Sequence, residues 1–288
     1  MTIGVRSRAT DYVALAKPRL NLLVVMSAVA GYAMAHGDTT DFAGLGWMVV
    51  GTGLVSGGAS AINQVIERET DGLMRRTRQR PLPDGRLTAV EALAFAGILS
   101  VSGLFVLAAG VNLLSAMVAL ATLASYAVVY TPLKKRTSFA TVIGAIPGAL
   151  PPVIGWAAAA DALSQGAWVL FGIVFLWQLP HFLALAWMYR EDYRKAGIVV
   201  LPSSDPDGSM TGRQMVANLL ALVPASLLPC LAGIAGTAYF VGAILLSVGF
   251  LAFGIAFAWN RSQARARRVF LASLAYLPAL LTLLAVAR

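Results

Sequence analysis

Apolar stretches long enough to cross a lipid bilayer recur throughout this chain. A helix rises about 1.5 Å per residue, so roughly 20 apolar residues span a hydrocarbon layer of about 30 Å. Nine such stretches are present, over residues 20–35, 43–66, 88–109, 113–130, 139–159, 166–189, 214–235, 238–260 and 269–286. The sequence therefore predicts an all-α, multi-span membrane protein with nine transmembrane helices.

The composition and the short connections are typical of one membrane-embedded bundle. Hydrophobic residues make up 58% of the chain and charged residues 12%, against about 45–50% and 25% in soluble domains, which excludes a water-soluble monomer. The turns at residues 110–112 and 236–237 have room only for a hairpin bend, so neighbouring helices must pack antiparallel. We expect a single domain over residues 1–288, with its helices around a central cavity. Prolines inside the spans suit a hollow bundle, although packing kinks explain any one of them equally well.

The basic residues that give the chain its net charge of +9 lie almost entirely on one predicted side of the membrane. Alternate connections hold all 22 Lys and Arg residues except the C-terminal Arg288, while the intervening connections carry Asp38, Asp41 and Asp161. This distribution is the positive-inside pattern, so the charge indicates topology and not nucleic-acid binding. We therefore expect a cytoplasmic N-terminus in a bacterial-type inner membrane, with a short cytoplasmic tail over residues 1–19.

Two connections on the predicted cytoplasmic side, residues 67–87 and 190–213, are much longer than the others. Four spans separate them, and an even number of crossings returns the chain to the same face. Both loops can thus cover one cavity mouth, and we expect the water-side chemistry there.

The first charged motif lies where the second span ends. Asn63, Glu67 and Asp71 are four residues apart, so a continuous helix places them in one stripe. An amide and two carboxylates suit Mg²⁺, which prefers oxygen ligands and usually also binds substrate phosphates. The alternative is a solvated helix end whose acids pair with nearby arginines, but Asn63 lies in an apolar segment, where polar groups are costly.

Arginines follow this motif closely. Five of them lie between residues 75 and 86, more than the topology signal requires, although that signal certainly contributes. The guanidinium group holds phosphate oxygens in bidentate fashion. Together the two features predict a magnesium diphosphate site.

The second charged motif lies where the sixth span ends. Glu191 or Asp192 could supply further metal oxygens, and Arg194 or Lys195 further phosphate contacts. A solvated, salt-bridged helix end explains the same residues equally well.

Five segments together resemble the UbiA-type intramembrane prenyltransferases, and within them the protoheme IX farnesyltransferases. They are residues 17–19 (Lys-Pro-Arg), 63–83, 131–135, 143–156 and 177–202. The resemblance covers essentially the whole chain from Lys17 onward, and the combination of motifs is highly specific. Nine spans with the N-terminus on the cytoplasmic side are also similar to this superfamily.

The resemblance implies transfer of the farnesyl group of farnesyl diphosphate to a vinyl group of protoheme, with water added, to give heme O. Many members carry two aspartate-rich motifs, and this sequence departs from them. Glu67 stands in place of an Asp in the first motif, and the second keeps only Asp192 beside Glu191, with Met188 and Ala196 four residues to either side. Heme-directed members look like this, so the departure favours them over relatives with aromatic acceptors.

On this basis each candidate residue receives a role. The catalytic and metal-binding group, with Mg²⁺ as cofactor, is Asn63, Glu67, Asp71 and Asp192; the diphosphate-binding group is Arg76, Arg80, Lys134, Lys135 and Arg194; the acceptor or heme-binding group is His181, Gln178 and Trp177. A hydrogen bond to a neighbouring helix is an equally good explanation for His181. Expected partners are farnesyl diphosphate, protoheme, membrane lipid and other membrane enzymes of heme synthesis, without nucleic acid.

Two alternatives differ in class or in acceptor. A multi-span transporter would also use broken helices, but transporters place ionisable groups near the bilayer centre, and here nearly all lie at one face. A prenyltransferase with an aromatic or another tetrapyrrole acceptor would share every motif and differ only in its acceptor pocket.

Overall fold

The computed structural model describes residues 7–36 and 41–287 and is all-helical over that part of the chain. Asp38 and Arg288, used above for the charge pattern, and residues 1–6 of the predicted tail lie outside the described residues. The helices are α1 (Arg8–Ala16), α2 (Pro18–His36), α3 (Phe42–Ile66), α4 (Arg68–Leu73), α5 (Ala89–Gly110), α6 (Leu113–Ala124), the π-helical turn η1 (Ser125–Tyr130), α7 (Thr131–Leu133), α8 (Ala140–Ala149), α9 (Pro151–Ala160), α10 (Gln165–Met188), α11 (Arg190–Lys195), α12 (Leu201–Ser204), α13 (Ser209–Leu231), α14 (Thr237–Trp259) and α15 (Gln263–Val286).

The prediction of nine spans is confirmed: the described residues contain nine helical stretches that are long and apolar enough to cross a membrane. The last of them begins earlier than expected, at Gln263 instead of residue 269, because the Ser262 hydroxyl accepts a hydrogen bond from the backbone N–H of Arg265. Hydropathy marks only the part of a helix that lies in lipid, whereas a cap marks the true start.

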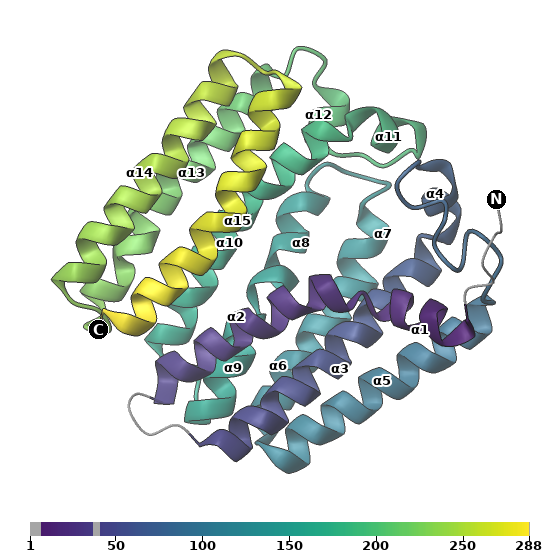
Figure 1. Ribbon diagram of the computed structural model, residues 1–288, viewed down its shortest axis with the longest axis horizontal. Helices are drawn as coiled ribbons and strands as arrows, with labels where there is room; N and C mark the ends of the chain where they lie inside the picture. The colour runs from purple at the N-terminus through teal and green to yellow at the C-terminus, as the bar shows by residue number, and fades with distance from the viewer. Residues whose placement is uncertain (1–6, 37–40, 288) are drawn as a thin grey trace.

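The predicted tail is partly helical. Residues 8–16 form α1, which ends at Lys17 in a left-handed conformation, with φ of 48°. Pro18 follows and begins α2. Proline has no backbone N–H and disfavours helix in the residue before it. The break bends the chain and separates α1 from the first long helix (Figure 1).

The fifth span is broken as its prolines suggest. Leu150 separates α8 from α9, and Pro151 and Pro152 occupy the first positions of α9, where a missing N–H costs nothing. Glycines let α9 approach α2 closely: a Cβ on Gly155 would lie 1.8 Å from the Ala28 carbonyl oxygen. Such small residues are the usual contact of helices in membranes, because dispersion replaces the hydrophobic effect there.

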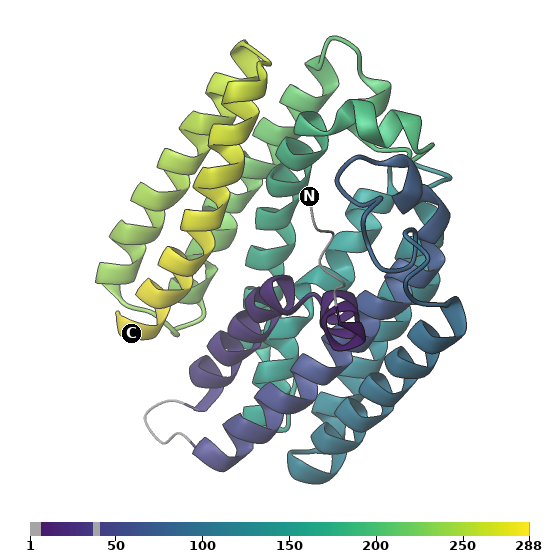
Figure 2. The same ribbon diagram turned by 45° about the vertical axis from the view of Figure 1, so that its right-hand side comes forward.

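The helices form a bundle in which α13, α14 and α15 pack with α10, while α2, α3, α5, α6 and α9 pack together on the other side (Figure 1). The loop that contains α4 and the loop that contains α11 and α12 lie at the same end (Figure 2). They touch through a small apolar cluster of Met74, Ala196 and Ile198. The backbone N–H of Val199 also donates to the Lys134 carbonyl at 2.8 Å. These contacts bring the ends of the second and sixth spans together.

Candidate active site

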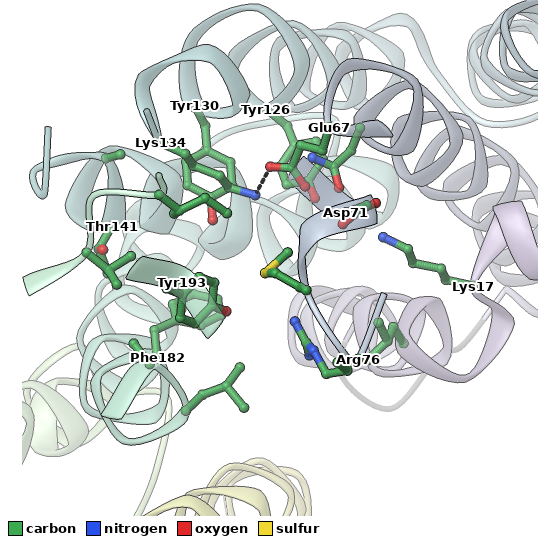
Figure 3. Close-up of a pocket in the computed structure, with 18 of the residues that line it drawn as sticks. Lys17, Glu67, Asp71, Arg76, Tyr126, Tyr130, Lys134, Thr141, Phe182 and Tyr193 are labelled. Carbon is green, nitrogen blue, oxygen red and sulfur yellow. Dashed lines mark hydrogen bonds and ion pairs between the residues drawn. The ribbon is translucent and has the colours of Figure 1, made fainter. Parts of the chain in front are cut away.

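A cavity of about 250 Å³, here called the polar cavity, lies beneath the two long loops. It is lined by Lys17, Leu20, Asn63, Glu67, Asp71, Met74, Arg76, Arg80, Tyr126, Tyr130, Lys134, Ala140, Thr141, Phe182, Leu185, Ala186, Tyr193, Ile198 and Val200. Segments far apart in sequence therefore meet here, with acids, cations and tyrosines facing one another (Figure 3).

The acidic stripe of the first motif faces this cavity although the helix is interrupted. Glu67 leaves helical geometry, with φ of −93° and ψ of 5°, and separates α3 from α4. The four-residue hydrogen bonds nevertheless continue, from Glu67 N–H to the Asn63 carbonyl at 2.9 Å and from Asp71 N–H to the Glu67 carbonyl at 2.8 Å. Asn63, Glu67 and Asp71 consequently remain on one side and all line the cavity.

Each carboxylate of the stripe has one cation as its partner. Lys134 Nζ lies 2.7 Å from Glu67 Oε1, and Arg80 Nη1 lies 2.6 Å from Asp71 Oδ2. Both pairs line the cavity, whereas the neighbouring Glu69 lies 4.0 Å from the adjacent Arg68 on the exposed side of α4. Lys134 also lies over the Tyr130 ring, 4.4 Å from its centroid.

Asp71 is the most deeply buried acid of this group, with 1% of its surface exposed. Burial raises the pKa of its carboxyl, against the lowering effect of Arg80. Its Oδ1 atom is buried and has no hydrogen-bond partner among the described residues. A buried carboxylate oxygen without a donor is costly, so this atom is a natural ligand for a cation.

The predicted diphosphate-binding cations divide into two sets. Arg76, Arg80 and Lys134 line the polar cavity. Lys135 lines a neighbouring hollow that Glu67 and Lys134 also line. Arg194 pairs with Glu191 of its own helix, and both side chains are more than half exposed.

Asp192 lies in α11 and does not line the polar cavity. The residue of α11 that does so is its neighbour Tyr193. Burial raises the pKa of the Tyr193 phenol, so its hydroxyl stays protonated and can donate a hydrogen bond.

A second cavity of about 320 Å³, here called the apolar chamber, adjoins the polar cavity. The two share five lining residues, which form their junction: Lys17, Leu20, Tyr126, Tyr130 and Phe182. Apolar residues of several spans and the proline break of α8 and α9 make up most of the chamber's wall. The chamber suits a flexible hydrocarbon chain whose charged end lies in the polar cavity.

The junction contains residues that the sequence analysis did not assign to the site. Lys17 follows α1 and lines both cavities. Tyr126 and Tyr130 come from the π-helical turn η1, which Thr131 closes by donating its hydroxyl to the Tyr126 carbonyl at 2.8 Å. A π-helical turn often marks a functional site. The sequence contains one signal for Lys17: it directly precedes the proline that begins the first span.

The predicted acceptor residues lie on different faces of α10. Gln178 lines the apolar chamber and donates to the Ala145 carbonyl at 2.7 Å. Trp177 and His181 stack on each other and face α15 instead. There Trp177 Nε1 donates to the Ser273 carbonyl at 2.8 Å, and His181 Nδ1 lies 2.7 Å from the Ser273 hydroxyl.

Comparison with known proteins identifies the group to which this architecture belongs. The model of the UbiA prenyltransferase family matches residues 24–277. A protoheme IX farnesyltransferase of Solibacter usitatus is 50% identical over 277 residues, which are 93% of this chain and 95% of the relative. A protein of the same name from Salinibacter ruber is 43% identical over 276 residues, 96% of this chain and 98% of the relative.

Solved structures show the same fold at low sequence identity. A digeranylgeranylglyceryl phosphate synthase superposes with a TM-score of 0.81 at 18% identity, over 97% of this chain and 98% of that chain. A UbiA homologue of Archaeoglobus fulgidus bound to GPP and Mg²⁺ superposes with a TM-score of 0.67 at 15% identity, over 96% of this chain and 100% of that chain. The family model, the near full-length relatives and the fold agree, and the chain therefore belongs to the UbiA prenyltransferase family.

Proposed function

We propose that this membrane protein transfers the farnesyl group of farnesyl diphosphate to a vinyl group of protoheme, with addition of water, giving heme O and diphosphate. One observation supports this most directly: a small cavity of acids and cations adjoins an apolar chamber, and aromatic rings line their junction. The relatives that are 40–50% identical over nearly their whole length are named protoheme IX farnesyltransferases, which favours protoheme over an aromatic or another tetrapyrrole acceptor. Membership of a prenyltransferase family argues against a transporter.

A magnesium ion fits the oxygens of the first motif. The described residues contain no group of three or more His, Cys, Asp and Glu side chains placed to hold a metal. Magnesium, however, usually takes only one or two carboxylates and completes its shell with water and substrate phosphate. We assign Glu67, Asp71 with its free Oδ1, and the Asn63 amide to this role. When bound, the ion would neutralise charge on the departing diphosphate. Asp192 is not included, because it does not line the cavity.

The cations of the polar cavity would hold the diphosphate. Arg76, Arg80, Lys134 and Lys17 line it, and such preorganised charges stabilise negative charge as it develops on a leaving group. Arg80 and Lys134 are already fixed by Asp71 and Glu67, so they need little reorganisation when the substrate binds.

The apolar chamber would hold the farnesyl chain, with its first carbon at the junction. The carbon–oxygen bond breaks there, and the electron pair leaves with the diphosphate. Tyr126, Tyr130 and Phe182 line this point, and the faces of aromatic rings attract a neighbouring cation. The terminal vinyl carbon of protoheme then forms the new carbon–carbon bond. Water adds to the adjacent carbon and releases one proton, which balances the reaction.

The acceptor residues remain a proposal of their own. Gln178 lines the chamber and would position the vinyl group. We therefore place the vinyl group of protoheme on the chamber side of α10. His181 and Trp177 lie on the face toward α15, where both contact Ser273, so we infer that they support α10 and do not contact the protoheme that Gln178 positions.

We also propose that the chain is one prenyltransferase domain in a bacterial-type inner membrane. The positive-inside rule supports a cytoplasmic N-terminus and cytoplasmic loops at residues 67–87 and 190–213. Farnesyl diphosphate would then reach the site from the cytoplasm. Other membrane enzymes of heme synthesis are candidate partners.

The test is an assay of membranes that contain the protein. They are incubated with farnesyl diphosphate, Mg²⁺ and either protoheme or a hydroxybenzoate, and products are identified by mass. We expect farnesylated, hydrated protoheme alone, and its loss when a chelator removes Mg²⁺. Prenylated hydroxybenzoate, or no product from protoheme, would contradict the proposed acceptor.

A further inference from the structure

A groove of about 390 Å³ lies between α13 and α14, apart from both cavities of the site. It is found at the end of the bundle where α13 begins and α14 ends, which is the predicted cytoplasmic end with most of the Lys and Arg residues. Arg213 of α13 and Arg261, just beyond α14, both line it. Among the described residues, neither guanidinium makes an ion pair within 4 Å.

The groove changes from polar to apolar along α13. Ser209, Arg213, Val216 and Leu220 line it in that order, and their spacing of three or four residues places them on one helix face. From Ser209 to Leu220 the helix rises about 16 Å. Leu220 is 54% exposed at the deeper end. A charged head and an apolar stripe thus follow each other along the axis of the span.

The two helices are close together at the floor of the groove. A Cβ on Gly212 would lie 3.1 Å from the Ala258 Cα, so no large side chain fills the space next to the two arginines. The pKa of the Asp207 carboxyl is lowered mainly by hydrogen bonds from Ser209 and only slightly by the charge of Arg261. Its Oδ1 accepts hydrogen bonds from the backbone N–H and the hydroxyl of Ser209, and it therefore serves the start of α13.

We propose that this groove binds one anionic phospholipid, with its phosphate between Arg213 and Arg261 and an acyl chain along Val216 and Leu220. Basic pockets between transmembrane helices bind such headgroups, and guanidinium groups match phosphate oxygens. Topology alone would explain two arginines at this end. It does not explain why they flank one groove that continues as an apolar stripe. The site is independent of the proposed enzyme activity.

The test is lipid binding to the full chain in detergent micelles, measured by native mass spectrometry. Phosphatidylglycerol, phosphatidylcholine with the same acyl chains, and inorganic phosphate are titrated separately. We expect phosphatidylglycerol to bind about tenfold more tightly than phosphatidylcholine. Arg213→Gln/Arg261→Gln should weaken phosphatidylglycerol about tenfold. Phosphatidylcholine, whose choline offsets the charge of its phosphate, should weaken by no more than about threefold.

The matched control is Arg267→Gln/Arg268→Gln, which removes the same charge from exposed positions at the start of α15. Equal weakening in this control would show a bulk charge effect and overturn the proposal. Equal affinity for both lipids, or inorganic phosphate bound as tightly as phosphatidylglycerol, would also overturn it. If the glutamine pair lowers the unfolding midpoint in phosphatidylcholine, Arg213→Lys/Arg261→Lys takes its place. The two lysines keep the positive charges but cannot hold phosphate oxygens in bidentate fashion, so we expect about threefold weaker phosphatidylglycerol binding. Unchanged affinity would count against the site.

Discussion

Asp71 and Glu191 each follow a long apolar helix at the same end of the bundle, but their surroundings differ completely. Asp71 is buried, and burial raises the pKa of its carboxyl against the effect of Arg80. Glu191 is exposed on α11 and pairs with Arg194 three residues later, and this hydrogen bond lowers the pKa of its carboxyl. Two similar acids therefore have different surroundings: Asp71 faces a cavity with an unpaired oxygen, and Glu191 is solvated at a helix start.

The largest effect should come from the buried motif. Asp71→Asn keeps the shape but removes the charge that holds Arg80 and the proposed metal, so we expect kcat/KM for farnesyl transfer to fall by about 100-fold to 1000-fold. Product formation from farnesyl diphosphate and protoheme measures it. The matched control is Glu69→Gln, since the Glu69 side chain is 79% exposed in the same helix. Activity within twofold of wild type in the Asp71 variant would remove the metal assignment.

The ion pairs of the two motifs should differ in stability. Lys134→Met leaves the Glu67 carboxylate without its partner, and breaking a buried pair costs about 3 kcal/mol. Arg194→Met breaks an exposed pair and should cost well under 1 kcal/mol. Denaturant or thermal unfolding in micelles compares them.

A double variant separates stability from chemistry. Lys134→Met/Glu67→Gln removes the uncompensated charge, so it should regain most of the stability lost by Lys134→Met without regaining activity. If activity returns with stability, Lys134 and Glu67 serve the fold and not the diphosphate.

A smaller effect is expected at the second motif. Asp192 does not line the polar cavity, so Asp192→Asn should lower kcat/KM by no more than about tenfold. Loss of a side chain that acts directly at the reacting centre lowers it more. The same product assay measures it. A loss as large as that of Asp71→Asn would mean that α11 turns toward the cavity when substrate binds, and the contrast between the motifs would fail.

The smallest effect concerns pH. The folded pKa of Glu191 is lowered, so its stabilising contribution is present above the unfolded pKa of about 4.3 and is lost as pH falls through the folded value. The unfolding midpoint of wild type should therefore exceed that of Glu191→Gln slightly at pH 7, and the two should converge in acid. A difference that grows toward low pH would contradict the assigned pairing with Arg194.

Much of the architecture could be predicted locally. Hydropathy and length predicted nine spans, and nine are present in the described chain. The spacing of Asn63, Glu67 and Asp71 predicted a single stripe, which persists because the backbone hydrogen bonds continue through the break at Glu67. Lys17 and Tyr126 were not assigned, because a lysine before the first span resembles a topology signal and a tyrosine within a span resembles ordinary packing.

The sequence by itself determined that the chain lies in a bilayer, how many spans it has and that Asn63, Glu67 and Asp71 share one stripe, since these depend on hydropathy and on the period of a helix. Only the tertiary structure decided which acids became buried and which cations joined them. Glu67 and Lys134 are 67 residues apart, and their contact depends on how α3 and α7 pack. Burial and long-range pairing are properties of that packing, and no local pattern encodes the difference between Asp71 and Glu191.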